Sequence, residues 1–197
     1  MIHIRDYNLE DELEWLDVHA SVMVDSYAWW TAIHKKPEYE NDIVDLVAIC
    51  DDRIVGFITI EINSQVLKEL DNYGFVWEFG VHRDYRGNGI GLKLIKKAHK
   101  ILNEKYKIDK TIWYSQDENA KKYYEHIGMK EIDRHWQFSI VPDDKLKKEF
   151  KNNGFDCWEI RGSCSIDDFD KVKKKYNVIE DDDPINPKIC IGYELVL

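Results

Sequence analysis

The most constraining feature of the chain is a glycine-rich turn between an apolar strand and an amphipathic helix, in the segment EFGVHRDYRGNGIGLKLIKKAHK, residues 78–100. The turn itself is Arg86-Gly87-Asn88-Gly89-Ile90-Gly91. Glycine lets a backbone approach a ligand closely and adopt conformations that a Cβ forbids. The first turn of the following helix leaves N–H groups unpaired at the positive end of the helix dipole. The segment therefore predicts an anion site, and a diphosphate is the expected ligand.

Two common phosphate-binding motifs do not fit this turn. A Rossmann fingerprint needs Gly or Ala three residues after its second glycine, where this chain has Leu92 or Leu94. A P-loop needs Gly-Lys followed by Ser or Thr, a triplet that does not occur in the sequence. The remaining pattern, Arg-x-x-Gly-x-Gly soon after a strand, resembles the coenzyme A pyrophosphate loop of the GNAT superfamily of N-acetyltransferases. The alternative is a turn that only caps a helix.

Apolar periodicity predicts a mixed α/β chain. Strands are expected at residues 2–7, 46–50, 54–60, 75–81, 110–114 and 129–140, and helices after Asn8 and at 22–34, 89–105 and 117–126. Residues 51–53 link two strands into a β-hairpin, and the helix between strands 75–81 and 110–114 makes them parallel neighbours. This α/β (α+β) order with a mixed sheet is similar to the GNAT-like acyl-CoA N-acyltransferase fold.

The resemblance weakens after Pro142. We expect a helix at 143–152, a strand at 155–161, a helix at 166–176, an acidic loop at 180–184 and a terminal strand at 189–197. Our interpretation is a single GNAT domain, 1–197, in which residues 141–188 are an insertion within the final β-hairpin. A small C-terminal subdomain is the competing boundary.

Composition excludes several classes of partner. The formal net charge of −10 argues against general nucleic-acid or anionic-membrane binding. The N-terminus carries acidic residues where a signal peptide is apolar, and no run approaches the roughly 18 apolar residues that cross a bilayer. The 4 cysteines lack a Cys-x-x-Cys pair, which indicates free thiols in a reducing compartment. We expect a cytoplasmic protein, and no metal site because the 7 histidines form no ligand motif.

The resemblance implies a set of coenzyme contacts. Backbone N–H groups of Gly87, Asn88, Gly89, Ile90 and Gly91, with the Arg86 guanidinium, would hold the pyrophosphate. The strand residues Phe79, Gly80 and Val81 would pair with the pantetheine arm, and the Val81 N–H would face the thioester carbonyl as the oxyanion donor.

Glu78 stands where many GNAT members carry an acidic general base, because it lies three residues before Val81. The alternative is a strand-end glutamate that faces solvent or pairs with Arg5 or Lys110. Glu61 on the adjacent hairpin strand is the reserve candidate for the base.

A second motif, DENAKKYYEHIGM at residues 117–129, resembles the GNAT helix of the form Asn-x-x-Ala-x-x-x-Tyr-x-x-x-Gly-Phe. Ala120, Tyr124 and Gly128 are in register, whereas Asp117 replaces the usual Asn and cannot donate a side-chain hydrogen bond to the pantetheine. Tyr124 is then the candidate general acid for the departing thiolate, and the alternative is a core aromatic. Tyr123 is interpreted as a packing neighbour.

The resemblance implies an N-acetyltransferase that moves an acetyl group from acetyl-CoA to a primary amine by direct attack through a tetrahedral intermediate. The acceptor, a small molecule or a peptide, is not specified by the sequence. Trp29 and Trp30 would line the acceptor groove or, as we favour, belong to the core. The alternatives are a non-catalytic acyl-CoA-binding or protein-interaction module and an enzyme for a larger acyl group. A homodimer through an edge strand is an expectation from the family.

Overall fold

The computed structural model describes residues 1–25, 33–67, 71–180 and 187–196. By its residue contacts the chain divides into two compact units. The first comprises Met1–Trp113, Gly128–Lys130 and Glu194–Leu197, and the second comprises Tyr114–Ile127 and Glu131–Tyr193. The predicted Trp29 and Trp30 and most of the acidic loop lie outside the described residues.

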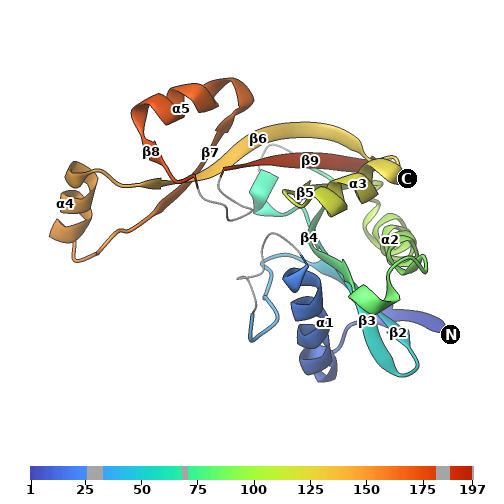
Figure 1. Ribbon diagram of the computed structural model, residues 1–197. Helices are drawn as coiled ribbons and strands as arrows, with labels where there is room; N and C mark the ends of the chain where they lie inside the picture. The colour runs from blue at the N-terminus through green and yellow to red at the C-terminus, as the bar shows by residue number, and fades with distance from the viewer. Residues whose placement is uncertain (26–32, 68–70, 181–186, 197) are drawn as a thin grey trace. The chain divides into compact units, whose positions relative to one another are not determined.

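The first unit contains the mixed sheet that the sequence predicts (Figure 1). Its strands follow the order β1 (Ile2–Asp6), β2 (Ile43–Cys50), β3 (Arg53–Ile62), β4 (Gly74–Val81) and β5 (Lys110–Ser115). The pairs β1–β2, β2–β3 and β3–β4 are antiparallel, and the pair β4–β5 is parallel, as expected. Asp51 and Asp52 close the β2–β3 hairpin with positive φ angles of 50° and 60°, which is the geometry of a tight two-residue turn.

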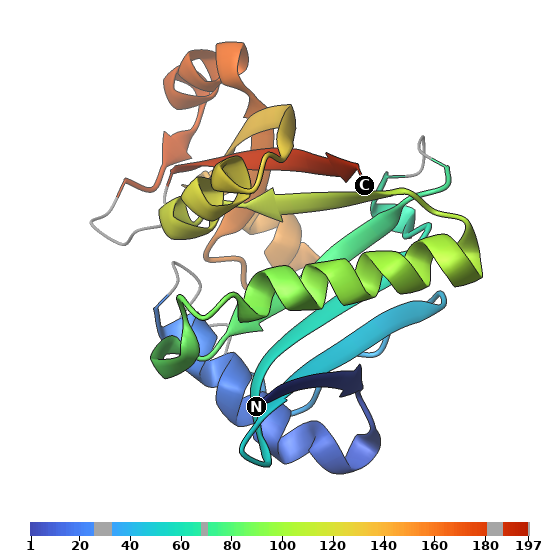
Figure 2. The same ribbon diagram turned by 90° about the vertical axis from the view of Figure 1, so that its right-hand side faces the viewer.

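Two helices cover opposite faces of this sheet. Figure 2 shows α2 (Ile90–Ile101) in front of the strands of the first unit and α1 (Glu12–Val24) behind them. The apolar face of α2 is buried as predicted, and the helix ends in a π turn at Leu102–Tyr106. On the other face Trp15 and Val18 pack against Phe57, whereas Leu13 of the same helix is exposed.

Asn8 begins the N-terminal helical segment, as the sequence predicts. Its side chain accepts from the Glu10 N–H, and the Asp11 carboxylate accepts from the Asn8 N–H, which completes a capping box for the 3-10 turn Leu9–Asp11 before α1. The second helix expected at 22–34 is not a separate element in the described residues. Residues 22–24 are the end of α1, residues 33 and 34 are not helical, and residues 26–32 lie outside the described part of the chain.

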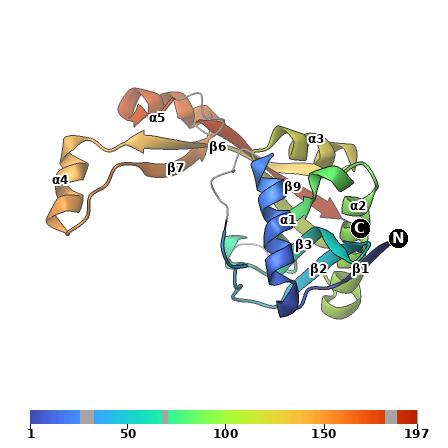
Figure 3. The same ribbon diagram turned by 60° about the horizontal axis from the view of Figure 1, so that its bottom comes forward.

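The second unit is built around the long strand β6 (Lys130–Val141) (Figure 3). Around it lie α3 (Glu118–His126), α4 (Asp144–Asn152), β7 (Ile160–Ser165), α5 (Phe169–Lys175), β8 (Asn177–Val178) and β9 (Lys188–Val196). β6 pairs antiparallel with β7 and β8, and β9 is its other neighbour. Phe169 stacks on Trp136 with ring centroids 4.4 Å apart, and this contact fixes α5 on β6.

The strand predicted at 155–161 is wrong in position. Residues 155–159 are not a strand, and the pairing with β6 begins at Ile160 and ends at Ser165. Phe155 and Trp158 are 65% and 82% exposed. Their aromatic side chains suggested a strand, but β-propensity depends on a partner strand, and the partner lies opposite the following residues.

Two expectations about the chain as a whole can be compared with the structure. Cys50, Cys157, Cys164 and Cys190 are all free thiols. None of the helices in the described parts of the chain is both long and apolar enough to span a bilayer.

Candidate active site

The glycine-rich loop has the geometry of an anion cradle. Gly87 and Gly89 adopt φ angles of +79° and +71°, and a Cβ at either position would meet nothing within 4 Å. The first hydrogen bond of α2 joins the Lys93 N–H to the Gly89 carbonyl at 3.1 Å. The N–H groups that precede this bond have no partner within the helix. The open glycine face and these N–H groups together fit a diphosphate.

Side chains hold the loop in this shape. The Asn88 amide donates to the Tyr85 and Arg86 carbonyls at 3.1 and 3.3 Å. Arg86 donates from Nε to the Val81 carbonyl at 3.0 Å and from Nη1 to Asp25 Oδ2 at 2.9 Å. The guanidinium of Arg86 is thus bound to the end of α1 as well as to the strand before the loop.

The β4 strand has a neighbouring strand on each side. With β5 the structure gives the pairs Gly74↔Thr111 and Phe75↔Ile112, near the start of β4. With β3 the pairing runs from Gly74 to Val81. The end of β4 that carries Phe79, Gly80 and Val81 leads into the short turn before the glycine-rich loop.

Strand β4 contains a β-bulge at Trp77, the residue before Glu78. Thr59 is opposite Glu78, but Ile60 is opposite Val76, so Trp77 is an extra residue in β4. The Trp77 indole donates to Glu61 Oε2 at 2.8 Å and remains 44% exposed. Bulges commonly re-aim side chains next to active sites.

Glu78 lies on the α1 side of the sheet, against a histidine. Glu78 Oε2 is 3.4 Å from His19 Nε2, and the two side chains are 17% and 4% exposed. Neither Arg5 nor Lys110 is the partner of Glu78, because Arg5 is bound to Asp11 at 2.6 Å and no ion pair joins Glu78 to Lys110 among the described residues. The alternative of a strand-end glutamate paired with one of these cations is therefore wrong.

A buried ion pair stands beside Glu78 on the same face. Lys36 Nζ is 2.9 Å from Asp45 Oδ2, and both side chains are nearly buried. The Lys36 ammonium also lies 4.9–5.3 Å from the ring centroids of Tyr7, Trp15 and Tyr39. Burial, and then the negative charges of Glu78, Asp45 and Glu61, raise the pKa of Tyr39. Tyr39 therefore stays a neutral hydroxyl in this region.

The reserve base Glu61 is fully engaged by donors. Its carboxylate accepts from the Glu40 and Asn41 N–H groups, the Asn41 amide and the Trp77 indole at 2.8–3.1 Å. Burial alone would raise the pKa of Glu61, but hydrogen bonds from Ser64, Trp77 and Asn41 outweigh it and lower the pKa. A carboxylate held in this way is a weak proton acceptor, so Glu78 is the better candidate.

The family assignment follows from the sequence. The model of the acetyltransferase (GNAT) family matches residues 5–129, a span that includes the glycine-rich loop, β4 and α3. The chain belongs to the GNAT family of acetyltransferases.

Similar proteins agree with this family. An N-alpha-acetyltransferase of Sulfurisphaera tokodaii is 27% identical over 136 residues, which cover 66% of this chain and 80% of that protein. The PaiA N-acetyltransferase of Thermoplasma acidophilum, solved with coenzyme A, is 21% identical with a TM-score of 0.54 over 68% of this chain and 92% of that one. A putative streptothricin acetyltransferase of Bacillus anthracis, solved with acetyl coenzyme A, is 18% identical with a TM-score of 0.55, and the match covers 100% of both chains.

The second GNAT motif forms helix α3 of the second unit. Asp117 is its N-cap, and Oδ1 accepts from the Asn119 and Ala120 N–H groups at 2.9 and 2.8 Å. Tyr124 is 7% exposed and packs edge-on against Tyr193 with centroids 5.5 Å apart. The carboxylate of Asp117 is therefore used for capping.

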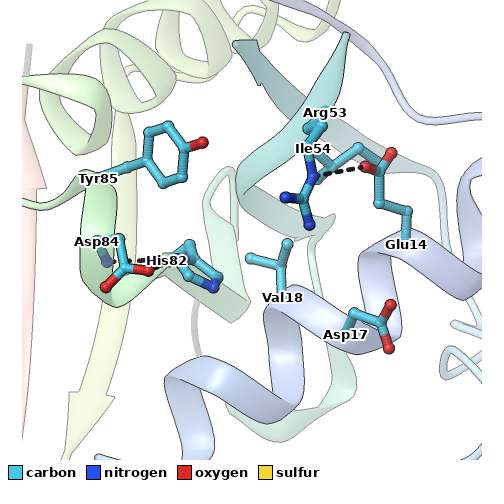
Figure 4. Close-up of a pocket in the computed structure, with 8 residues that line it drawn as sticks. All are labelled: Glu14, Asp17, Val18, Arg53, Ile54, His82, Asp84 and Tyr85. Atoms are coloured by element: carbon cyan, nitrogen blue, oxygen red, sulfur yellow. Dashed lines mark hydrogen bonds and ion pairs between the residues drawn. The ribbon is translucent and has the colours of Figure 1, made fainter. Parts of the chain in front are cut away.

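A separate cavity of about 440 Å³ lies in the first unit of this GNAT protein (Figure 4). Its lining consists of Glu14, Asp17, Val18, Arg53, Ile54, His82, Asp84 and Tyr85. Carboxylates outnumber its arginine, which is already 3.9 Å from Glu14. This cavity does not suit a diphosphate.

His19, Lys36, Asp45 and Tyr39 were not predicted from the sequence. For His19 a signal was present, because it follows Trp15 by four residues and so shares its helix face. Lys36 lies in the loop before β2, and Asp45 lies within β2. No spacing in the sequence predicts that their side chains meet.

Proposed function

We propose that this GNAT protein transfers an acetyl group from acetyl-CoA to a primary amine by direct attack, with the α-amine of a peptide as the favoured acceptor. The observation that carries the proposal is the open glycine face of the loop at the start of α2, which follows the strand β4 that bears Glu78. The N-alpha-acetyltransferase relative and the coenzyme complexes of similar folds support it.

Acetyl-CoA supplies an activated thioester. The N–H groups of residues 87–91 and the Arg86 guanidinium bind its diphosphate, and Phe79, Gly80 and Val81 pair with its extended arm. The Val81 N–H stabilises the developing oxyanion, a type of contact whose loss typically costs about 2.7–4 kcal/mol of barrier. Asp117 and Ala120 of α3 are the further coenzyme contacts in this proposal.

Glu78 accepts the proton of the attacking amine. A peptide α-ammonium has a pKa of about 7.7–8.0, so most of it is protonated at neutral pH and a positioned carboxylate helps to provide the neutral nucleophile. Tyr124 donates its hydroxyl proton to the departing sulfur. The nitrogen loses its second proton to solvent as the intermediate collapses, and Tyr124 regains a proton from solvent. The Glu78 carboxyl releases the first amine proton to solvent after product leaves.

The charge of the acceptor side favours a cation. Glu78, Asp45 and Glu61 face this region. Among the described residues a lysine, Lys36, pairs with Asp45, whereas Glu78 contacts His19 and Glu61 accepts from uncharged donors. The exposed Trp77 ring, edge-on to Phe75 at 4.9 Å, provides an apolar wall beside Glu78. An ammonium next to a short apolar group matches both features.

The proposal also covers the insertion in the final hairpin, the cellular location and the oligomeric state of the chain. Residues 141–188 are an insertion within the final hairpin, because β6 and β9 are sheet neighbours although α4, β7, α5 and β8 lie between them in sequence. The free cysteines support a cytoplasmic location. A homodimer through an edge strand remains a prediction.

The experiment is a thiol-release assay with acetyl-CoA and a pool of short peptides and polyamines. Amine-dependent thiol release is expected, and Glu78→Gln should lower kcat/KM by about 10²–10⁴-fold. Glu61→Gln is the matched control, which should affect stability more than turnover. Tight coenzyme binding without release for any amine would instead favour the non-catalytic module.

A further inference from the structure

We propose that His19 is a positioning residue for the base, donating from Nε2 to the Glu78 carboxylate and holding it toward the acceptor. The inference rests on the proposed role of Glu78. His19 stands on α1, outside the loop and the strand that carry the other site residues.

The approach of the two side chains is the first observation. His19 Nε2 and Glu78 Oε2 are 3.4 Å apart, slightly longer than an ordinary N–H···O hydrogen bond. Catalytic hydrogen bonds are often long before substrate binds and shorten in the complex. A carboxylate at this distance favours the proton on Nε2, whether the imidazole is neutral or charged.

The second observation is that the His19 ring is fixed in place. It stacks on Trp15 with centroids 4.9 Å apart and planes at 20°, and on Phe57 at 5.9 Å and 30°. The residue is 3% exposed. Packing between two aromatic side chains restricts the orientation of the His19 ring, and in this orientation Nε2 faces Glu78.

The third observation is that α1 cannot move away from β4 without losing close packing. A Cβ added to Gly80 would lie 2.7 Å from Val22 Cγ2, so the helix and the strand are in direct contact two residues beyond Glu78. This contact sets the distance between the helix and the strand that carry His19 and Glu78.

Other charged groups near Glu78 already have partners. Lys36 is bound to Asp45, Glu61 is saturated by donors, and the pKa of Tyr39 is raised, so that it remains neutral. His19 is therefore the group placed to stabilise the Glu78 carboxylate. No proton passes to His19, because Nε2 already carries one; the amine proton stays on Glu78 until it leaves to solvent.

The test compares wild type with His19→Leu, His19→Gln and Glu78→Gln. The ¹³C resonance of the Glu78 carboxyl, on protein labelled at glutamate and assigned with Glu78→Gln, reports its contact with position 19 at a fixed pH, and kcat and KM are measured separately with the peptide pool. Gln retains an N–H donor, whereas Leu does not. His99→Leu is the matched control, since it removes an imidazole that is 1% exposed from α2 on the other face of the sheet.

In His19→Leu the Glu78 carboxyl resonance should move and kcat should fall about tenfold, with little change in the KM for acetyl-CoA. His19→Gln should restore most of kcat, and His99→Leu should leave both kcat and the resonance in place. A purely structural His19 would lower kcat alike in both His19 variants without moving the Glu78 resonance, and that result would overturn the inference.

The two proposals fail in different ways. If Glu78→Gln keeps full activity, Glu78 is not the base and the proposed mechanism is wrong. If Glu78→Gln is inactive while the Glu78 carboxyl resonance is the same in wild type and His19→Leu, only the role of His19 is wrong. The NMR measurement needs no acceptor, so it decides the contact even if no peptide in the pool is a substrate.

Discussion

Arg86 of the glycine-rich loop donates to Asp25, at the C-terminal end of α1, with Nη1 and Oδ2 2.9 Å apart. Asp25 also accepts from Arg83 at 2.7 Å, so one carboxylate binds both arginines beside the glycine-rich loop. All three side chains are 34–45% exposed, and solvent weakens such pairs. The arrangement puts a negative charge close to the place where a diphosphate is expected.

Removing that charge should therefore tighten coenzyme binding. We expect Asp25→Asn to lower the Kd for coenzyme A by about two- to fivefold, because exposed charge interactions contribute up to about 1 kcal/mol. Arg86→Ala should raise the Kd by about tenfold or more, since hydrogen bonds to charged groups contribute about 1.5–3 kcal/mol. Calorimetry at two salt concentrations measures both effects; weaker binding in Asp25→Asn would mean that Asp25 mainly organises the loop.

The open face of Gly89 gives a prediction with an internal control. Gly89 and Gly154 have φ angles of +71° and +82°, and an added Cβ meets nothing within 4 Å at either position. Alanine at either site should cost about 1–2 kcal/mol of unfolding free energy, because L-residues are strained in this region. Only Gly89→Ala should weaken coenzyme A binding, by about tenfold. Equal affinities in the two variants would show that the loop face is not the diphosphate site.

Tyr124 and Tyr123 are adjacent on α3, and their rings are 6.2 Å apart. Tyr124→Phe should lower kcat by about 10²-fold with little change in acetyl-CoA affinity, because a positioned general acid contributes at least that factor. The burial that raises the pKa of Tyr123 is consistent with packing, so Tyr123→Phe should leave kcat nearly unchanged. Steady-state kinetics with an excess of amine make the comparison, and unchanged turnover in Tyr124→Phe removes it from the mechanism.

Lys36 and Asp45 form a pair whose side chains are only 6% and 10% exposed. Lys36→Met should cost about 3–5 kcal/mol of unfolding free energy, because it leaves a buried carboxylate unpaired. Adding Asp45→Leu should recover part of this loss, so the double variant is more stable than the sum of the single effects. Lys35→Met is the control, since Lys35 is 62% exposed and bound only to Glu38. Urea titrations measure all four variants.

His99 makes the stability of the fold depend on pH. Burial lowers the pKa of His99 to about 4 from 6.5, and Nε2 lies 3.0 Å from the Thr111 hydroxyl, which also accepts from the Trp113 indole. Since the folded pKa lies below the unfolded one, the contribution is fully present above pH 6.5. It is lost as the pH falls toward 4, by about 3 kcal/mol. Urea unfolding at pH 7 and 4.5 should show a smaller loss in His99→Gln than in wild type.

Local patterns predicted much of this fold. The capping residues Asn8, Asp117 and Asp143 begin helical segments where expected, because a short polar side chain before an apolar repeat is a strong local signal. The glycines at 87 and 89 predicted a loop with positive φ, and the structure has it. These features depend on neighbours within a few residues.

The features that the sequence did not predict depend on contacts between different segments of the chain. The position of β7 is set by pairing with β6, and the partner of Lys36 comes from another element. The approach of His19 to Glu78 requires α1 to cross β4 at one place, which the sequence does not specify. The extra residue in β4 likewise appears only when the register with β3 is known.

The extra residue, Trp77, limits which changes in the sequence of β4 the fold can accept. Because Trp77 interrupts the ladder, the first part of β4 and the part that leads into the coenzyme loop keep separate registers with β3. Removing one residue here would restore an even ladder but turn either Glu78 or the upstream side chains to the opposite surface. We therefore expect a change in the length of β4 at this point to be rejected more strongly than an exchange of the amino acid at position 77.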